Sequence, residues 1–523
     1  MRKIPVLTAE QAAALVQDGQ TITTGGFVGS SLPEALSEAL EKRFLTTGKP
    51  ENLTLFYSGG QGNKDGSGAD HFAHEKMTGK VIAGHWNLAP KLSKLAVENK
   101  IAGYNLPQGI LSCLYRDIAA KREGMISHVG LHTFVDPRNS GGKINEKAQE
   151  DLVEVIQING KERLFFKTFP IDVAFIRGTY ADETGNISFE KELGPFDATS
   201  MAQAVKNCGG KVIVQVEKIV KAGTLDPKLV KIPGIYVYAV VIGPEETQQQ
   251  SLGCCFDPSL CGEARLAEEC TLEPLPLSAK KIIGRRAAME LAENVVVNLG
   301  IGAPEYVAAI AGEEGISDYM TLTVEGGAVG GNPQGGVRFG GSRNADCLLE
   351  QGIQFDFYDG GGLDLACIGM AQADQQGNIN VSRFGSRLAG CGGSIDITQN
   401  SKKVIFCGTF TANGLKTKVE QGSLLIEQEG KEHKFITAVD QVTFSGAYAA
   451  QNNQKVLYVT ERAVFELRSD GLYLTEIAPG VDLKTHILDQ MDFQPKISQE
   501  LSLMNPAIFQ PDTMGLQAML KGR

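Results

Sequence analysis

The sequence predicts an α/β protein made of two related open α/β domains, each with a mainly parallel sheet. Three observations predict this fold class. Short apolar runs are followed by glycine-rich turns and then by helical patterns, which is the order of a parallel strand and its crossover helix. Similar segments recur in the second half of the chain. The chain has 523 residues, which is enough for about two to four domains.

The internal repeat consists of two separate segments that keep one spacing. The segment from Asp172 to Ile187 returns as Asp364 to Ile379, with Asp, Gly and Asn at matching positions. At the same spacing, the apolar run that begins at Lys211 corresponds to the run that begins at Lys403. Two matches in one register predict a duplicated fold. The expected division is an N-terminal domain over residues 1–242, a linker over 243–277 and a C-terminal domain over 278–523.

Within each half, the sequence predicts a strand, a glycine-rich turn and a helix in that order. In the first half, a strand over 21–24 precedes Gly25-Gly26, and a helix that Pro33 begins runs to about Leu40. In the second half, Ser278 caps a helix over 279–293, and a strand over 295–299 precedes the Gly300-Ile301-Gly302 turn. Further buried strands are expected over 173–176, 213–216, 321–324 and 365–368.

Composition and charge exclude several classes of protein. The net charge of −11 gives no general attraction for nucleic acid or anionic membranes. The N-terminus lacks a signal-peptide core, and the longest strongly apolar run, over 235–242, is too short for a membrane span. We expect a cytoplasmic protein with reduced cysteines.

Two groups of residues could in principle bind a metal. Cys254, Cys255, Cys261 and Cys270 lack zinc-site spacing and have no histidine nearby. The group of His71, His74 and His85 has little local carboxylate support. No metal is expected, and the role of both groups stays open.

The composition departs from average in glycine. The chain has 61 glycines, about 12% against a usual level of roughly 7%. Such an excess is expected at tight turns and where backbone approaches a ligand. The main patches lie at 25–29, 300–302, 326–331, 360–362 and 390–393, whereas Gly59-Gly60 and Gly141-Gly142 receive no role from the sequence.

A carboxylate ends one expected strand. Glu325 follows the strand over 321–324 and is followed by Gly326-Gly327. Ligands of open α/β sheets bind at the carboxyl ends of strands, and no local cation accompanies Glu325, so it is a candidate nucleophile or base. The other reading is a turn residue that faces water. Similarly, the Gly392-Gly393 backbone and the Gln108 amide could stabilise an oxyanion, or could belong to ordinary turns.

Taken together, these motifs resemble the family I coenzyme A transferases. The matching stretches follow the family's order at 25–34, 105–109, 297–304, 323–327, 392–396 and 458–465. The insert over 223–234 and the Asp257-Pro258 pair are similar to those of single-chain acetate or propionate CoA-transferases. The resemblance implies the CoA-transferase fold, with tandem α-type and β-type halves. The Glu325-Gly326-Gly327 sequence departs from relatives that have Pro or Ser there, which is expected to alter the shape of the acyl pocket.

The resemblance also implies an activity and a site. It implies that Glu325 forms a glutamyl-CoA thioester while CoA moves from a short-chain acyl-CoA to a free carboxylic acid. Gln108, reaching from the other half, would stabilise the oxyanion. Coenzyme A would be a co-substrate rather than a permanent cofactor, and the protein would be a homo-oligomer, a dimer or a tetramer. The implied CoA contacts are Gly300, Ile301, Gly302, Gly390, Gly392 and Gly393.

Other functions remain open at this point. A succinyl-CoA:3-ketoacid CoA-transferase would share the Glu and glycine motifs. A sugar-phosphate isomerase or a dinucleotide-dependent oxidoreductase could use Gly300-x-Gly302 as a phosphate turn, but would not account for the repeat. In a non-catalytic CoA sensor, Glu325 would be structural.

Overall fold

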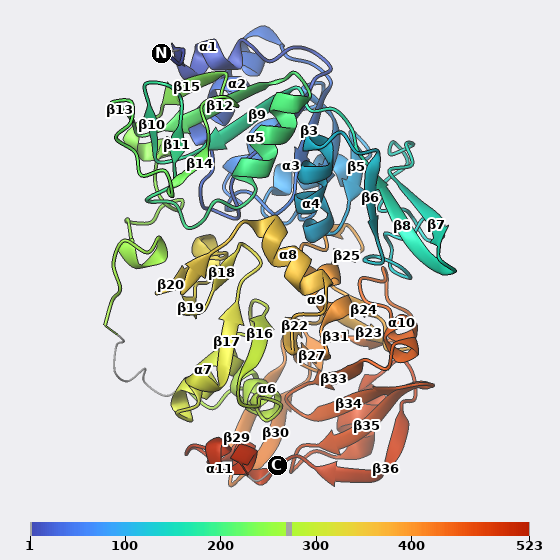
Figure 1. Ribbon diagram of the computed structural model, residues 1–523. Coiled ribbons are helices and arrows are strands. Elements are labelled where there is room, and N and C mark those ends of the chain that lie inside the picture. Colours follow the sequence, from blue (N-terminus) through green and yellow to red (C-terminus); the bar gives the residue numbers. More distant parts are fainter. Residues whose placement is uncertain (1–2, 268–274, 522–523) are drawn as a thin grey trace. The chain divides into compact units, whose positions relative to one another are not determined.

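The computed structural model describes residues 3–267 and 275–521 and has an α/β fold (Figure 1). The chain forms two compact units. The first unit contains residues 1–266, 324–359 and 385–396, and the second contains 267–323, 360–384 and 397–523. Two short segments from the second half of the sequence, one of them beginning at Val324, therefore belong to the first unit. The division at 242/243 and 277/278 that the repeat suggests stays a prediction.

The described part of the first unit is built on an eight-stranded parallel sheet. Its central strands are almost wholly buried and rich in β-branched residues, as expected of a sheet that helices cover on both faces. In spatial order the strands are β1 (Val6–Leu7), β15 (Ala239–Ile242), β12 (Lys211–Val216), β9 (Val173–Arg177), β2 (Thr21–Thr24), β3 (Leu53–Tyr57), β4 (Thr78–Ala83) and β5 (Ala102–Asn105).

Helices and smaller sheets complete the first unit. Its helices are α1 (Ala9–Ala13), α2 (Glu34–Thr47), α3 (Pro90–Val97), α4 (Gln108–Ala119), α5 (Ala198–Asn207) and α8 (Gln351–Asp359). The smaller sheets comprise β6 (Gly124–Ser127), β8 (Lys161–Lys167) and β7 (Val153–Ile158); β13 (Lys218–Val220), β10 (Tyr180–Asp182), β11 (Ile187–Ser188) and β14 (Val230–Ile232); and β19 (Asn332–Pro333) with β20 (Ser342–Arg343). Strand β18 (Ala328–Val329) pairs antiparallel with β21 (Cys347–Leu348).

The second unit has its own sheet and its own hydrophobic core. Five strands run parallel, in the order β17 (Met320–Thr323), β16 (Val295–Leu299), β22 (Leu365–Gly369), β27 (Lys403–Cys407) and β33 (Lys455–Val459). The antiparallel β34 (Ala463–Arg468) and β35 (Gly471–Ile477) follow, and then β36 (Lys496–Leu503). Smaller strands include β23 (Gln372–Asp374), β24 (Ile379–Asn380), β32 (Phe435–Ile436), β29 (Lys416–Glu420) and β30 (Ser423–Gln428), and the helices include α6 (Ala279–Ala288), α7 (Tyr306–Glu313), α10 (Gly446–Gln451) and α11 (Leu516–Lys521).

The repeat has a structural counterpart. The two matched sequences form β9 with β10 in the first unit and β22 with β23 in the second. In both, an aspartate after the strand, Asp182 or Asp374, accepts hydrogen bonds from the asparagine four residues later. The α/β fold with two related sheets is thus confirmed.

Most expected elements lie close to their predicted positions. The strands over 21–24 and 295–299 coincide with β2 and β16. Ser278 caps α6 by accepting a hydrogen bond from the Lys281 N–H, but that helix ends at Ala288, earlier than expected. Helix α2 extends beyond Leu40 to Thr47, where Gly48 in the left-handed region ends it.

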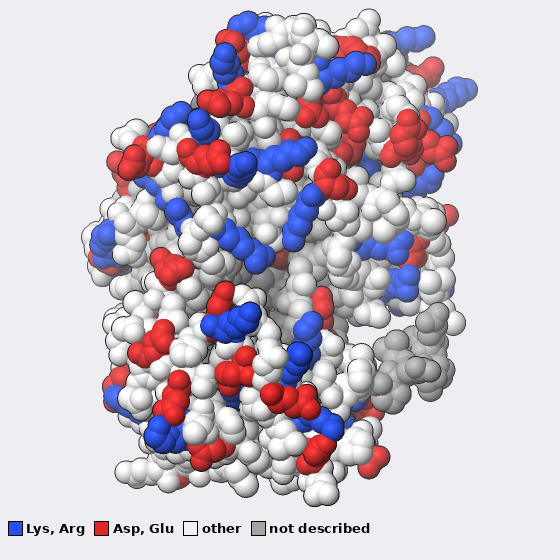
Figure 2. Space-filling model, turned by 180° about the vertical axis from the view of Figure 1, so that it is seen from behind, with Lys and Arg blue, Asp and Glu red and all other residues white. Residues whose placement is uncertain are grey.

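Two surface observations agree with the composition. On the face drawn in Figure 2, acidic and basic side chains are interspersed. Among the described helices, none combines the length and the apolar character that a membrane span requires.

Candidate active site

The candidate site lies in the first unit, where the chain leaves the carboxyl ends of neighbouring parallel strands. Ser58 follows β3, Gly84 and His85 follow β4, and Gln108 follows β5 after Leu106-Pro107. This edge is where open α/β sheets bind their ligands. The two later segments of the first unit, 324–359 and 385–396, contribute Glu325 and Gly390–Gly393.

Gln108 is the first residue of α4 and is 2% exposed. Its backbone N–H donates to the Gly392 carbonyl at 3.0 Å. A Cβ atom on Gly84 would lie 3.2 Å from the Gln108 Cα atom and would also collide with the Ser58 carbonyl oxygen. Glycine at position 84 therefore lets α4 begin directly against the end of β4.

The segment over 389–393 is fastened to these strand ends by backbone hydrogen bonds. The Trp86 N–H donates to the Ala389 carbonyl at 2.8 Å, and the Gly392 N–H donates to the Gly84 carbonyl at 2.8 Å. The Cys391 N–H donates to the Asn105 side-chain oxygen at 3.0 Å. Residue 393 therefore has a fixed position relative to α4.

Glu325 occupies a tight turn between Val324 and Ala328. The Val324 N–H donates to the Ala328 carbonyl and the Gly327 N–H donates to the Val324 carbonyl, each at 2.9 Å. Gly327 has φ +110, and a Cβ atom there would collide with the Leu349 carbonyl oxygen. The turn therefore requires glycine at position 327, and the Glu325 side chain on it is half-buried.

The Glu325 carboxylate is held by a backbone donor and by no charge. The Gly393 N–H donates to it, and a Cβ atom on Gly393 would collide with Oε2 of Glu325. No ion pair involves Glu325 in residues 3–267 and 275–521. Burial raises the pKa of Glu325 to about 7, although the Gly393 N–H partly opposes the rise.

The structure thus brings together residues that are far apart in the sequence. A Cβ atom on Gly392 would be 3.7 Å from Oε1 of Gln108, and the next residue, Gly393, contacts the Glu325 carboxylate. A carboxylate of raised pKa, two backbone glycines and a buried amide form one group. Such a group can supply a nucleophile and donors to an oxyanion.

Aromatic side chains that the sequence did not indicate line this group. A Cβ atom on Gly393 would be 3.0 Å from Phe355 of α8. The Phe27 ring lies against Gly59 and Gly340, and its centroid is 5.7 Å from that of Phe196. Gly59 therefore has a role: it lets the Phe27 ring lie close to Gln108, whose Cδ atom would be 3.4 Å from a Cβ at position 59.

Two of the other unassigned glycines, Gly60 and Gly142, also have structural roles. A Cβ atom on Gly60 would be 2.6 Å from Nδ1 of His85. Gly142 has φ +74 and accepts a hydrogen bond from the Asn105 N–H at 2.8 Å, which supports the end of β5.

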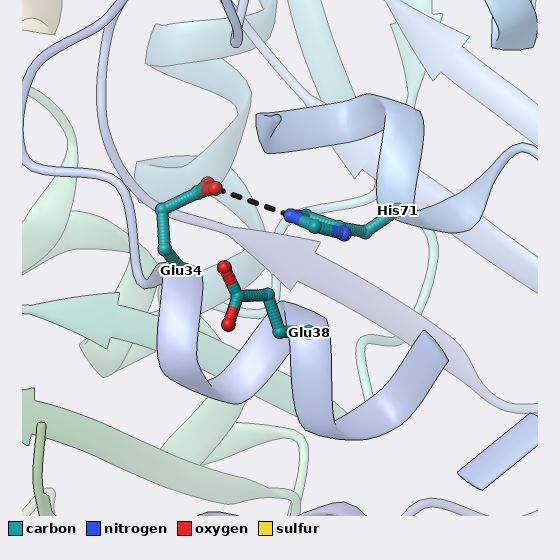
Figure 3. Close-up of side chains that lie close together, drawn as sticks. All are labelled: Glu34, Glu38 and His71. Carbon is teal, nitrogen blue, oxygen red and sulfur yellow. Dashed lines mark hydrogen bonds and ion pairs between the residues drawn. The ribbon is translucent and has the colours of Figure 1, made fainter. Parts of the chain in front are cut away.

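His71 and His74 are used in hydrogen bonds to carboxylates. Nε2 of His71 is 3.1 Å from Glu34, and its Nδ1 is 2.6 Å from Glu41, which also contacts His74 at 2.6 Å. Burial lowers the pKa of His71, but the two carboxylates outweigh it and raise the pKa to about 9. His71 is therefore a cation between two carboxylates. Although Glu34, Glu38 and His71 lie close enough to enclose a metal ion (Figure 3), a protonated imidazole offers it no lone pair.

His85 has different surroundings. Its Nδ1 atom is buried with no hydrogen-bond partner. Burial, aided by Lys64, lowers its pKa to about 4, so the ring is neutral at physiological pH.

The remaining predicted residues divide between structural turns and the second unit. Gly26 (φ +100) and Gly29 pack against backbone of residues 30–31 and against Val337. Gly300, Ile301 and Gly302 belong to the second unit; Ile301 is 59% exposed, and a Cβ atom on Gly302 would meet no atom within 4 Å. Cys254, Cys255 and Cys261 are free thiols, whereas Cys270 lies outside the described residues.

Comparisons with known proteins decide the family. A model described as Coenzyme A transferase matches residues 6–243. The chain is 45% identical over 521 residues to the caffeate CoA-transferase of Acetobacterium woodii, an alignment that covers 98% of this chain and 99% of that protein. It is 43% identical over 514 residues to the acetate CoA-transferase YdiF of Escherichia coli strain K12, with 98% and 96% covered. The chain belongs to the coenzyme A transferase family.

The solved structures agree with this membership. The apoenzyme of the acyl-CoA transferase YdiF from Escherichia coli O157:H7 superposes with a TM-score of 0.94 at 42% identity, covering 98% of this chain and 97% of that one. A second structure of that protein is a thioester complex with CoA, with a TM-score of 0.92. This CoA-transferase is therefore an enzyme whose homologues move coenzyme A between acyl-CoA and carboxylates.

Proposed function

We propose that this enzyme transfers coenzyme A between a short-chain acyl-CoA and a free carboxylic acid of the acetate, propionate or butyrate type, by a ping-pong mechanism through Glu325. The observation that carries the proposal is the position of Gly392-Gly393. A Cβ atom on Gly392 would lie 3.7 Å from Oε1 of Gln108, and the Gly393 N–H donates to the Glu325 carboxylate. The relative crystallised as a thioester complex with CoA supports a covalent route.

The reaction begins when a Glu325 oxygen attacks the thioester carbonyl of acyl-CoA. The C–S bond breaks, the CoA thiolate leaves and an acyl-glutamyl anhydride remains. The thiolate then attacks the glutamyl carbonyl, which releases the first carboxylate and leaves a glutamyl-CoA thioester. The second carboxylate repeats the two steps in reverse and leaves as the new acyl-CoA.

The surroundings of Glu325 suit these steps. A carboxylate is a weak nucleophile, and the absence of a paired cation in the described residues together with the raised pKa makes it a stronger one. Each attack creates an oxyanion, for which the Gly393 N–H and the Gln108 amide are the proposed donors. One such donor is typically worth about 2.7–4 kcal/mol of barrier. Gly300, Ile301, Gly302 and Gly390 are proposed to contact CoA.

The choice of acid is proposed from relatives and from the aromatic residues beside the site. The relatives named for acetate and caffeate differ greatly in the size of their acid. Phe27 and Phe355 lie close to the Gln108 and Gly393 positions, so they limit the space for a bulky acyl group. Short acids are therefore proposed as the better substrates.

The decisive experiment looks for the covalent intermediate. The protein is incubated with acetyl-CoA and its intact mass is measured with and without hydroxylamine. The expected result is a CoA adduct that hydroxylamine removes and that Glu325→Gln does not form. No adduct and no transfer to a second acid would favour a CoA sensor instead.

An acceptor panel then distinguishes the substrate classes. Acetate, propionate, butyrate, lactate, succinate, acetoacetate and caffeate are compared by kcat/KM with acetyl-CoA as donor. The highest values are expected for acetate, propionate and butyrate. A preference for succinate and acetoacetate would instead indicate the 3-ketoacid type, and a preference for caffeate would indicate an aromatic acid.

A further inference from the structure

The Gln108 side chain ends against a buried chain of polar groups that the proposed steps do not use. Nε2 of Gln108 donates to Oε1 of Gln351 at 3.2 Å. Nε2 of Gln351 in turn contacts Oδ2 of Asp197 at 2.9 Å, Oγ of Ser58 at 2.8 Å and Oγ of Ser112 at 2.6 Å. Their exposed fractions are 2% for Gln108, 1% for Gln351, 5% for Asp197, 5% for Ser58 and 0% for Ser112.

These groups come from four separate elements of the first unit. Ser58 follows β3, Gln108 and Ser112 are one turn apart on α4, Asp197 precedes α5, and Gln351 begins α8. All of them are far from one another in sequence, apart from the pair on α4. An arrangement that four elements hold in place has little freedom to change.

The donors and acceptors in this series of hydrogen bonds determine which way each amide group faces. An ionised carboxylate only accepts hydrogen bonds. Both serine hydroxyls donate to Oδ2 of Asp197, so their lone pairs are left for the Gln351 amide. The Gln351 NH₂ group must therefore face Asp197, since the reversed amide would place two acceptor oxygens in contact in a buried site.

The orientation of Gln351 then determines that of Gln108. With its NH₂ group toward Asp197, Gln351 presents only the acceptor Oε1 to Gln108. Gln108 must therefore direct its own NH₂ group toward Oε1 of Gln351. The two ends of an amide have nearly the same shape, so only the hydrogen-bond partners can select between them.

We propose that Asp197 and Gln351 are positioning residues that fix the Gln108 amide in the orientation needed to stabilise the oxyanion. Gln351 holds one N–H of Nε2, Oε1 lies on the Gly392 side, and the second N–H is the proposed donor to the substrate oxygen. The inference rests on the proposed role of Gln108 in the transfer reaction. It assigns a function to the buried Asp197 carboxylate, which the proposed steps of the reaction do not use.

A double-mutant cycle tests the inference. Gln108→Met and Gln351→Met are made singly and together, and kcat and KM are measured for acetyl-CoA and propionate. Gln351→Met is expected to lower kcat between about 10- and 100-fold with little change in KM. In the Gln108→Met background it is expected to lower kcat no further, because there is then no amide to orient.

Two further variants distinguish the proposed effect from a loss of activity caused by misfolding. Gln354 also lies on α8 and is 1% exposed, and its Nε2 has no hydrogen-bond partner, so Gln354→Met is a matched control that should leave kcat unchanged. Asp197→Asn keeps the shape but can donate to Gln351. It is expected to lower kcat in the wild-type background and to have no effect in Gln108→Met.

The outcomes separate the two levels of the proposal. If the wild-type protein neither transfers CoA nor forms the adduct, the proposed function fails. If transfer occurs but the losses from Gln108→Met and Gln351→Met multiply, Gln351 acts structurally and the inference is overturned. If Gln108→Met leaves kcat unchanged, the inference is also overturned, while the role of Glu325 stands.

Discussion

At the scale of single residues, Glu325 has two opposing properties. Burial raises its pKa to about 7, which makes the ionised carboxylate a stronger nucleophile. The same shift leaves a large share of the group protonated, and therefore unreactive, near neutral pH. The pH dependence of the transfer rate is expected to follow the fraction of Glu325 that is ionised.

The first prediction concerns the pH dependence of the rate. Only the ionised form of Glu325 can attack, so kcat/KM for acetyl-CoA is expected to rise about tenfold per pH unit below pH 7 and to level off above it. Initial rates between pH 5.5 and 8.5 check this, with circular dichroism at each pH to confirm folding. A profile that is level down to pH 5.5 would show that Glu325 is not the group that titrates.

The second prediction concerns the length and charge of the same side chain. Glu325→Gln keeps the shape but removes the nucleophile, so transfer is expected to fall on the order of 10⁴-fold or more. Glu325→Asp keeps the charge but withdraws the carboxylate by about one methylene from the Gly393 N–H. It is expected to be inactive in transfer, or at most a slow acyl-CoA hydrolase. Thiol release with and without acceptor acid distinguishes these results, and full transfer by Glu325→Asp would contradict the assignment.

At the scale of elements, the segment over 389–393 connects the strand ends with the carboxylate. Gly84 and Asn105, which follow or end strands of the first-unit sheet, hold it by hydrogen bonds. Its two consecutive glycines serve different needs. Gly392 has φ +51, and a Cβ atom there would make ordinary contacts at 3.7 Å, whereas Gly393 has no positive φ but no room for a side chain.

The third prediction uses this difference. Gly393→Ala would place a methyl group against Oε2 of Glu325, so kcat is expected to fall at least about 100-fold with little loss of stability. Gly392→Ala meets no atom closer than 3.7 Å. It is expected to cost about 1 kcal/mol of stability through its positive φ and to retain most activity. Steady-state kinetics and urea unfolding of both variants check the pair, and equal losses of activity would contradict the assigned roles.

The elements and the site differ in how far sequence could predict them. The sequence predicts strands such as β2 and β16 to the residue, because β-branched Thr, Ile and Val make up most of each run and a glycine turn ends it. Glu325, Gln108 and Gly393 could be singled out from local motifs. Phe355 and Gln351 could not, because their contacts depend on how α8 packs against α4, and no local pattern distinguishes a glutamine that orients another from one that faces water.

At the scale of the whole molecule, the first unit contains several carboxylates whose pKa is raised by burial. The pKa is raised to about 6 for Asp197, about 7 for Glu325 and about 8 for Asp359. A carboxyl with a raised pKa in the folded state binds its proton more tightly there than in the unfolded chain. The stability that it contributes is present below its unfolded pKa and is lost as pH rises through the folded value.

The last prediction isolates the part of this effect that belongs to Glu325. Glu325→Gln cannot ionise, so its free energy of unfolding is expected to exceed that of the wild type by an amount that grows from pH 5 to pH 8. Because Glu325 is partly exposed, we expect a gain of roughly 1 kcal/mol, smaller than the full shift would give. Urea unfolding at both pH values measures it.

A second carboxylate provides the control for this experiment. Burial raises the pKa of Glu290, but Arg286 and Lys403 outweigh it, so the pKa is lowered overall. The stability that ionised Glu290 contributes is lost only as the pH falls below the usual pKa of a glutamate. Glu290→Gln is therefore expected to lower the free energy of unfolding equally at pH 5 and pH 8. If Glu325→Gln behaves in the same pH-independent way, Glu325 is ionised without cost in the folded protein. Burial would then not raise the pKa of Glu325, and there would be no reason to expect it to be a stronger nucleophile than an ordinary carboxylate.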